Sequence, residues 1–104
     1  MTQPQLVTVF AALGDETRWS ILTALGEGDA SASALADRLP VSRQAIAKHL
    51  GVLASAGLVA NERRGREQIY ALRSAPLDDA RRCLDLVSAQ WDAALARLAA
   101  FVEE

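Results

Sequence analysis

The sequence predicts a mainly α-helical single domain, spanning residues 1–104, that carries one small β-hairpin. Through most of the chain, apolar residues recur at the three- and four-residue steps of buried helical faces. β-prone residues gather only between residues 58 and 72, and glycines and prolines divide the chain into short segments. A chain of this length, in which 51% of the residues are hydrophobic, is large enough for one modest core.

Two helices are predicted in the first third of the chain. Residues 5–13 form the first, which is unusually apolar for an N-terminal segment. Gly14 ends this helix, and Asp15 then has the position and side chain of an N-cap for a second helix. Ile21 and Leu25 lie on one side of the second helix, and the glycines near its end stop it. An apolar helix at the end of a chain needs a surface to pack against.

Two shorter helices with a turn between them follow. Either Ser31 or Ser33 caps the first of these, and Pro40 ends it. Ser42 caps the second, which runs to about residue 56. Residues 31–56 are therefore predicted to form a helix-turn-helix, a motif whose second helix enters a groove of DNA.

The second helix of this motif has two very different faces. Ile46, Leu50 and Leu53 recur at helical steps and form an apolar stripe. The other faces carry long polar side chains that suit a polyanion: Arg43, Gln44 and Lys48. Such a helix packs on its own domain through one side and presents the other side to a partner.

The β-prone region is predicted to be a hairpin. Residues 58–60 and 68–72 flank the sequence Arg63-Arg64-Gly65-Arg66, which we expect to form the turn. A hairpin directly after a recognition helix is the wing of a winged helix-turn-helix, here residues 57–73. We expect its three arginines to lie against phosphates or to reach into the minor groove. The alternative is a solvated turn that is charged for solubility.

A long final helix is predicted from about Pro76 to Glu103. Two apolar series repeat every seven positions along it: Leu77, Leu84, Trp91 and Leu98, and Ala80, Val87, Ala94 and Phe101. A small domain cannot cover such a seam alone, so we expect residues 1–13 and 76–104 to form a symmetric homodimer. The predicted interface residues are Leu6, Val7, Phe10, Leu84, Val87, Trp91, Leu95, Leu98 and Phe101. The alternative is a monomer that folds the final helix back onto itself.

The charges of the chain are strongly segregated. The formal net charge is −2, but residues 38–73 contain seven Lys or Arg against two acidic residues, a balance of +5. The rest of the chain has four basic and eleven acidic residues, a balance of −7. A basic patch on an acidic body is the electrostatic pattern of a DNA-binding protein with limited non-specific affinity. A solvated charged surface is the alternative.

The sequence also limits where the protein works. It contains no segment long and apolar enough to cross a membrane and no signal peptide after Met1, so we expect a cytoplasmic protein without membrane contact. The single Cys83 cannot form an internal disulfide, which fits a reducing compartment. Cys83 lies next to the apolar seam, where it is either a packed thiol or a thiol sensor.

Four blocks of sequence carry a family resemblance: ALGDETR at residues 12–18, LADRLPVSR at 35–43, KHL at 48–50 and AGLV at 56–59. In this order they resemble the ArsR/SmtB family of bacterial winged-helix repressors, over nearly the full length of the chain. The resemblance implies five helices with a β-wing and a homodimer that binds pseudo-palindromic operator DNA. It also implies that transcription is blocked until a signal releases the protein.

The resemblance raises the question of a metal site, because many members of this family sense metals or metalloids. The Cys-x-Cys pair of the family's arsenic and cadmium sensors aligns with Ser31 and Ser33, whose hydroxyls are poor ligands for soft ions. Residues 76–104 contain no His, so the ligand set of the zinc sensors has no counterpart. The only His, His49, falls in the recognition helix. We therefore expect no metal site and no cofactor.

The predicted function is that of a dimeric repressor that binds double-stranded DNA. We expect Arg43 to read guanine, Gln44 to read adenine, and the helix N-terminus with Lys48 to hold phosphates. The full set of predicted DNA-contacting residues is Ser42, Arg43, Gln44, Ala47, Lys48, His49, Arg63, Arg64 and Arg66. Gly51 departs from the family, which often has a charged or long polar residue there, and so removes one expected phosphate contact.

Two alternatives remain at this stage. One is a metal- or thiol-responsive repressor whose site the sequence does not reveal. The other is a winged-helix module that binds proteins and not DNA. An enzyme is not expected, because no nucleophile, base and orienting group form a recognisable set. The effector is unknown from sequence.

Overall fold

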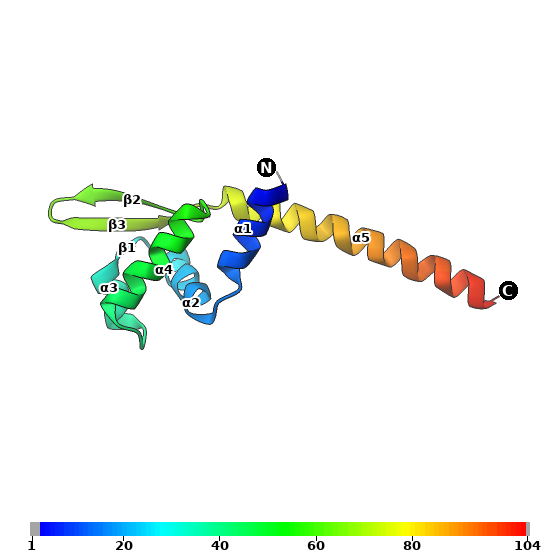
Figure 1. Ribbon diagram of the computed structural model, residues 1–104, viewed down its shortest axis with the longest axis horizontal. Helices are drawn as coiled ribbons and strands as arrows, with labels where there is room; N and C mark the ends of the chain where they lie inside the picture. Colours follow the sequence, from blue (N-terminus) through cyan, green and yellow to red (C-terminus); the bar gives the residue numbers. More distant parts are fainter. Residues whose placement is uncertain (1–2, 104) are drawn as a thin grey trace.

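The computed structural model describes residues 3–103 of the chain, with side chains from Gln5 onward. Within this range it contains five helices and one small antiparallel sheet, which confirms the predicted fold class (Figure 1). The elements in chain order are α1 (Gln3–Leu13), α2 (Glu16–Glu27), β1 (Ala30–Ser31), α3 (Ala32–Arg38), α4 (Arg43–Ser55), β2 (Val59–Arg64), β3 (Glu67–Leu72) and α5 (Ala75–Glu103). Helices α3 and α4 are therefore followed directly by the antiparallel pair of β2 and β3.

The core lies where α2, α3 and α4 meet. The predicted stripe of α4 is fully buried, since Ile46, Leu50 and Leu53 are each 0% exposed. Ile21 of α2 and Leu35 of α3 meet this stripe in the same cluster and are also fully buried. Burial of one side of α4 fixes which of its residues face outward, because the side chains on the opposite side of the helix then point to solvent.

Side-chain caps start three of the helices. Asp15, Ser31 and Ser42 each accept a hydrogen bond from the backbone N–H three residues later, at 2.9, 3.1 and 3.1 Å. These bonds satisfy N–H groups that a helix start leaves free. Of the two serines that the sequence offered for α3, Ser31 is the cap.

The end of α4 is closed by a glycine motif. Gly57 has a φ of +77°, which a residue without Cβ adopts readily. Its N–H donates to the carbonyl of Ala54, and the N–H of Leu58 donates to the carbonyl of Leu53, both at 3.0 Å. This is the Schellman arrangement, and it buries Leu58 completely beside Leu53. The chain therefore leaves the recognition helix and enters the wing in a fixed direction.

The sheet differs from the predicted hairpin in two ways. A third strand, β1, pairs antiparallel with β3, so the strand order is β1-β3-β2. With only two residues, β1 is too short for any periodic signal. Strand β2 also continues through Arg64, so the predicted four-residue turn is wrong and the actual turn is Gly65 and Arg66. Gly65 has a φ of +63°, as a two-residue hairpin turn requires.

Helix α5 extends far beyond the rest of the domain (Figure 1). The molecule measures 69 × 28 × 21 Å, and its radius of gyration is 18.3 Å, against about 13 Å for a compact chain of about this length. Only the first turns of α5 pack on the domain, beside α1, and Ala80 is the last buried residue of the helix. In residues 3–103 neither α5 nor any other helix combines the length and apolarity needed to span a bilayer.

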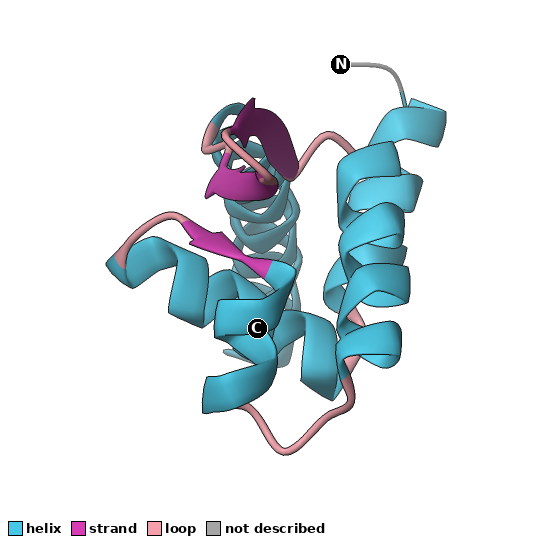
Figure 2. Cartoon of the chain, turned by 90° about the vertical axis from the view of Figure 1, so that its left-hand side faces the viewer, coloured by secondary structure: helices cyan, strands magenta, loops and turns pink. Residues whose placement is uncertain are grey.

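The predicted interface residues of α1 are placed unequally. Phe10 is half-buried and packs against the protomer's own core, and Leu6 is also half-buried. Val7 is 63% exposed. Much of the apolar surface of α1 is therefore already covered within one protomer, because the start of α5 lies beside it (Figure 2).

A prediction follows for the stability of the core. Leu50→Ala removes a fully buried side chain and should lower the free energy of unfolding by about 2 to 5 kcal/mol. Val52→Ala is the matched control on the same helix, because Val52 is 39% exposed, and its effect should stay within about 0.5 kcal/mol. Urea unfolding at fixed protein concentration measures both. Equal losses for the two variants would contradict the assignment of the buried face.

Candidate nucleic-acid interface

A groove separates the N-terminal half of α4 from the wing. Its volume is about 440 Å³. Four of the predicted DNA-contacting residues line it: Arg43, Gln44, Ala47 and Arg66. The start of α3 and strand β3 complete its walls, so three separate segments of the chain line this groove. The structure therefore brings the candidate base-reading residues together with one arginine of the wing.

The groove carries positive charge on both of its walls. The backbone of a duplex runs between its major and minor grooves, so a helix in one groove and a wing in the other must straddle it. Arg43 on the helix wall and Arg66 on the wing wall supply positive charge, and Glu67 is the one acidic residue of the lining. Arg43 and Gln44 are exposed and have planar side chains that match the edges of guanine and adenine.

Sequence reasoning missed several polar residues of this groove, among them Ser33, Gln68 and Tyr70. Gln68 and Tyr70 are two positions apart on β3 and so point to the same side of the sheet. This alternation was available in the sequence, but the side that faces α4 is fixed only by the pairing of β1 with β3. Ser33 was considered as a cap, a role that Ser31 fills, and as the counterpart of a family metal ligand, but not as part of this groove.

The three arginines of the wing have different surroundings. Nε of Arg64 donates to the Glu62 carboxylate at 2.7 Å, and this hydrogen bond raises the pKa of Arg64. Nε of Arg63 donates to the carbonyl of Gly65 at 3.2 Å. Arg66 faces the groove. Arg64 is therefore paired with a carboxylate of its own strand, whereas Arg66 lies beside α4.

The other flank of α4 carries a second, separate hollow of about 580 Å³. Its lining includes Lys48, Gly51 and Val52 of α4 together with Arg18 of α2. Lys48 thus lies apart from the groove that contains Arg43. Because Gly51 has no neighbour within 4 Å of an added Cβ, nothing inside this protomer requires a glycine there.

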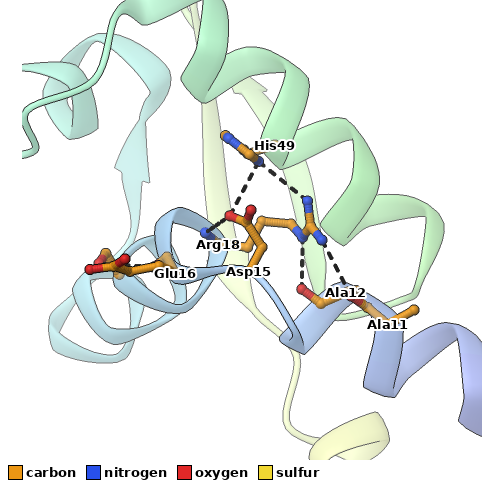
Figure 3. Close-up of polar contacts among 7 residues, drawn as sticks. Ala11, Ala12, Asp15, Glu16, Arg18 and His49 are labelled. Carbon is orange, nitrogen blue, oxygen red and sulfur yellow. Dashed lines mark hydrogen bonds and ion pairs between the residues drawn. The ribbon is translucent and has the colours of Figure 1, made fainter.

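His49 faces the domain and not the groove of Arg43. Its Nδ1 lies 3.8 Å from the Asp15 carboxylate and 3.4 Å from an Arg18 guanidinium nitrogen (Figure 3). The side chain is 22% exposed. Its second ring nitrogen points away from Asp15 and Arg18. Of the predicted DNA-contacting residues, His49 is thus the one that is most engaged with its own protein.

Arg18 joins three parts of the domain. Its Nε donates to the carbonyl of Ala12 at 2.7 Å, and one terminal nitrogen donates to the carbonyl of Ala11 at 3.3 Å. These carbonyls belong to the last turn of α1, where a helix leaves its acceptors free. The other terminal nitrogen faces His49 on α4. A single side chain of α2 thus contacts both α1 and the recognition helix (Figure 3).

Residues 5–103 hold no group of three or more His, Cys, Asp or Glu side chains that could share a metal ion. The hydroxyl of Ser31 caps α3, and Ser33 lines the groove beside α4. Cys83 is a free, half-buried thiol on α5. The two positions that correspond to the family's Cys-x-Cys ligands thus belong to the DNA-binding region in this chain.

Comparisons with known proteins agree with this geometry. A model of the helix-turn-helix domain family matches residues 13–62. The transcriptional repressor SdpR of Bacillus subtilis is 35% identical over 71 residues, which cover 68% of this chain and 79% of that protein. The structure of an ArsR-like transcriptional regulator from Rhodococcus sp. RHA1 is 55% identical, with a TM-score of 0.82 over 91% of this chain and 90% of that one. The chain belongs to the ArsR family.

The family resemblance deduced from the four sequence blocks is therefore confirmed. This ArsR-family protein is a transcriptional regulator with a helix-turn-helix DNA-binding domain. A further structure is similar along most of the chain: a homodimeric winged helix-turn-helix DNA-binding domain from Mycobacterium bovis. It is 29% identical, with a TM-score of 0.66 over 88% of this chain and 82% of that one.

The carboxylate of Asp15, which caps α2, makes the stability of this regulator change with pH in the acid range. The backbone N–H of Arg18 and nearby positive charge hold the pKa of Asp15 below its ordinary value of 3.8. The folded state therefore favours the carboxylate, and this stabilisation is complete above the ordinary pKa and is lost as the pH falls through the lowered one. Asp15→Asn keeps a capping oxygen that does not titrate.

We expect the melting temperature of Asp15→Asn to fall less than that of the wild type between about pH 5 and about pH 2.5. Thermal unfolding followed by circular dichroism measures this difference. Asp92→Asn is the matched control, because Asp92 is an exposed carboxylate on α5. If Asp15→Asn and the wild type lose stability in parallel, Asp15 does not carry the acid sensitivity.

Proposed function

We propose that this protein is a dimeric repressor that binds a pseudo-palindromic operator through α4 and the wing. In this proposal residues 31–56 and 57–73 form the DNA-binding part, and residues 1–13 and 76–104 hold the two protomers together. Two α4 helices would enter successive major grooves, about 34 Å apart. The resemblance to SdpR, which is a transcriptional repressor, supports repression as the outcome of binding.

The groove between α4 and the wing carries this proposal. It places Arg43, Gln44 and Arg66 around one space of about 440 Å³. Arg43 then reads guanine, Gln44 reads adenine, and Ala47 contacts the base edges or the thymine methyl. Ser42 and the N-terminus of α4 hold a phosphate on this side of the helix, and Lys48 holds one on the other side. Arg63 and Arg64 add contacts along the wing.

The exposed seam of α5 supports the dimer. Its predicted interface residues are between 48% and 76% exposed in a single protomer: Leu84, Val87, Trp91, Leu95, Leu98 and Phe101. A row of this length exceeds the scattered apolar residues of an ordinary monomer surface. The similar domain from Mycobacterium bovis is homodimeric. Symmetric pairing of α5, with Val7 of α1 at its side, would remove this row from water.

We further propose that release from DNA does not depend on a metal. The family's thiolate positions hold serines here, and hydroxyls bind soft ions poorly. Titration of zinc, cadmium or arsenite into the protein–DNA complex tests this point. Release of the DNA by any of these ions at stoichiometric concentration would contradict it.

Base reading by α4 is tested on DNA fragments selected from the host genome. Arg43→Ala should weaken binding to the selected sequence by about 1 to 3 kcal/mol and leave binding to random DNA nearly unchanged. Arg64→Ala should weaken binding to both kinds of DNA and lower the slope of log K against log salt by about one. Fluorescence anisotropy over a series of salt concentrations measures all four quantities. Arg97→Ala, in the exposed part of α5, controls for the loss of charge.

If Arg43→Ala leaves operator affinity unchanged while Arg64→Ala changes sequence preference, the base-reading role of α4 is wrong. Failure of the wild-type protein to enrich any fragment at moderate salt would instead favour a module that binds proteins. Recovery of an inverted repeat would support both DNA reading and two-fold symmetry.

The dimer is tested at Trp91, which lies in the middle of the exposed row and is 66% exposed in the protomer. Trp91→Glu places a charge in the proposed interface and should reduce the mass in solution from twice 11.1 kDa to 11.1 kDa. Light scattering after size-exclusion chromatography measures the mass. Ala89→Glu introduces the same charge on the opposite, exposed face of α5 and should leave the dimer intact. A Trp91→Glu protein that remains dimeric would rule out this interface.

A further inference from the structure

Arg18 makes no contact with the proposed DNA groove, yet it touches both α1 and α4. We infer that Arg18 is a positioning residue for DNA binding: it fixes the orientation and proton of His49, so that the outer nitrogen of His49 donates to a DNA phosphate. This inference rests on the proposed function, since it adds a contact on the flank of α4 that carries Lys48. It also gives the half-buried His49 a defined part in binding.

The hydrogen bonds of Arg18 leave its guanidinium little freedom. A guanidinium has five N–H donors and no acceptor, in one fixed plane. Bonds of 2.7 and 3.3 Å to the carbonyls of Ala12 and Ala11 hold this plane against the last turn of α1. The remaining terminal nitrogen then faces Nδ1 of His49 at 3.4 Å. The position of α1 is thereby linked to the side chain of α4.

This contact determines where the proton of a neutral His49 lies. Because Arg18 only donates, Nδ1 of His49 must accept, and the proton of the ring sits on Nε2. Figure 3 shows Nε2 directed away from Arg18 and Asp15, and the His49 side chain is 22% exposed. The ring thus offers an N–H donor outward, beside Lys48 in sequence. A backbone phosphate on this flank of α4 would accept it.

Asp15 supplies the competing arrangement. Its carboxylate oxygen lies 3.8 Å from the same Nδ1 and would accept a proton from it. Without Arg18, the ring should therefore carry its proton on Nδ1, bonded to Asp15, and present a bare Nε2 to the DNA. A bare ring nitrogen repels a phosphate oxygen, since both are acceptors. Arg18 accordingly decides between a donor and an acceptor on the outer surface of α4.

The first test uses the free protein. His49 is the only histidine of the chain, so the imidazole ¹⁵N spectrum reports this residue alone. At a pH where the ring is neutral, the wild type should show Nε2 protonated and Nδ1 bare. Arg18→Met should reverse this, with Nδ1 protonated. An unchanged tautomer in Arg18→Met overturns the inference, whether or not the protein binds DNA.

The second test uses the operator and two replacements of His49. Gln places an amide nitrogen near the position of Nε2, and Asn places its amide near Nδ1. We expect His49→Gln to bind the operator within about threefold of the wild type, and His49→Asn and Arg18→Met to bind about tenfold more weakly. Arg97→Met, which removes an arginine from the exposed part of α5, should bind like the wild type. Equal affinities of His49→Gln and His49→Asn would overturn the phosphate contact.

A double mutant separates positioning from a general loss of stability. In the His49→Gln background the outer donor no longer depends on a tautomer, so adding Arg18→Met should cost less than about twofold in affinity. If Arg18 only stabilises the fold, the same tenfold loss should appear in both backgrounds, and the inference fails. A wild-type protein that binds no operator would refute the proposed function and the phosphate contact, while the tautomer would still decide whether Arg18 orients His49.

Discussion

Burial of the apolar stripe of α4 is the constraint on which the rest of the interface depends. Ile46, Leu50 and Leu53 are fully removed from water. Burial of each of these side chains stabilises the fold by roughly 1.5 to 3 kcal/mol. Rotation of α4 by half a turn would expose all three and turn Gln44 and Lys48 toward the core. The helix therefore has one stable orientation. Burial of its apolar residues in the core determines which of its other residues face outward.

The surroundings of α4 reinforce this orientation from both ends. Ser42 caps its first turn, and the Schellman arrangement at Gly57 directs the chain straight into the wing. The wing must then run beside α4, which is why Arg66 and Arg43 share a groove although 22 positions separate them in sequence. On the opposite flank, Arg18 ties the helix to α1. Arg18 thus connects α4 with α1, which belongs to the proposed dimer interface.

The charge distribution has a consistent physical meaning in this arrangement. The basic region of residues 38–73 coincides with α4, the turn before it and the wing, whereas the acidic remainder forms the body and α5. An acidic body limits attraction to arbitrary DNA, so affinity depends on the fit of the groove. The pairing of Arg64 with Glu62 acts in the same direction, because the carboxylate offsets part of the wing's positive charge.

The sequence by itself determined the helices, the caps at Asp15 and Ser42, the buried stripe and the wing, because these follow from local periodicity and turn chemistry. It did not determine β1, the length of the wing turn or the choice of Ser31 as a cap. The sequence pattern likewise does not predict the contact of Arg18 with His49 or the position of Tyr70 in the groove. They depend on distances between elements far apart in the chain, which only the packing of the core fixes.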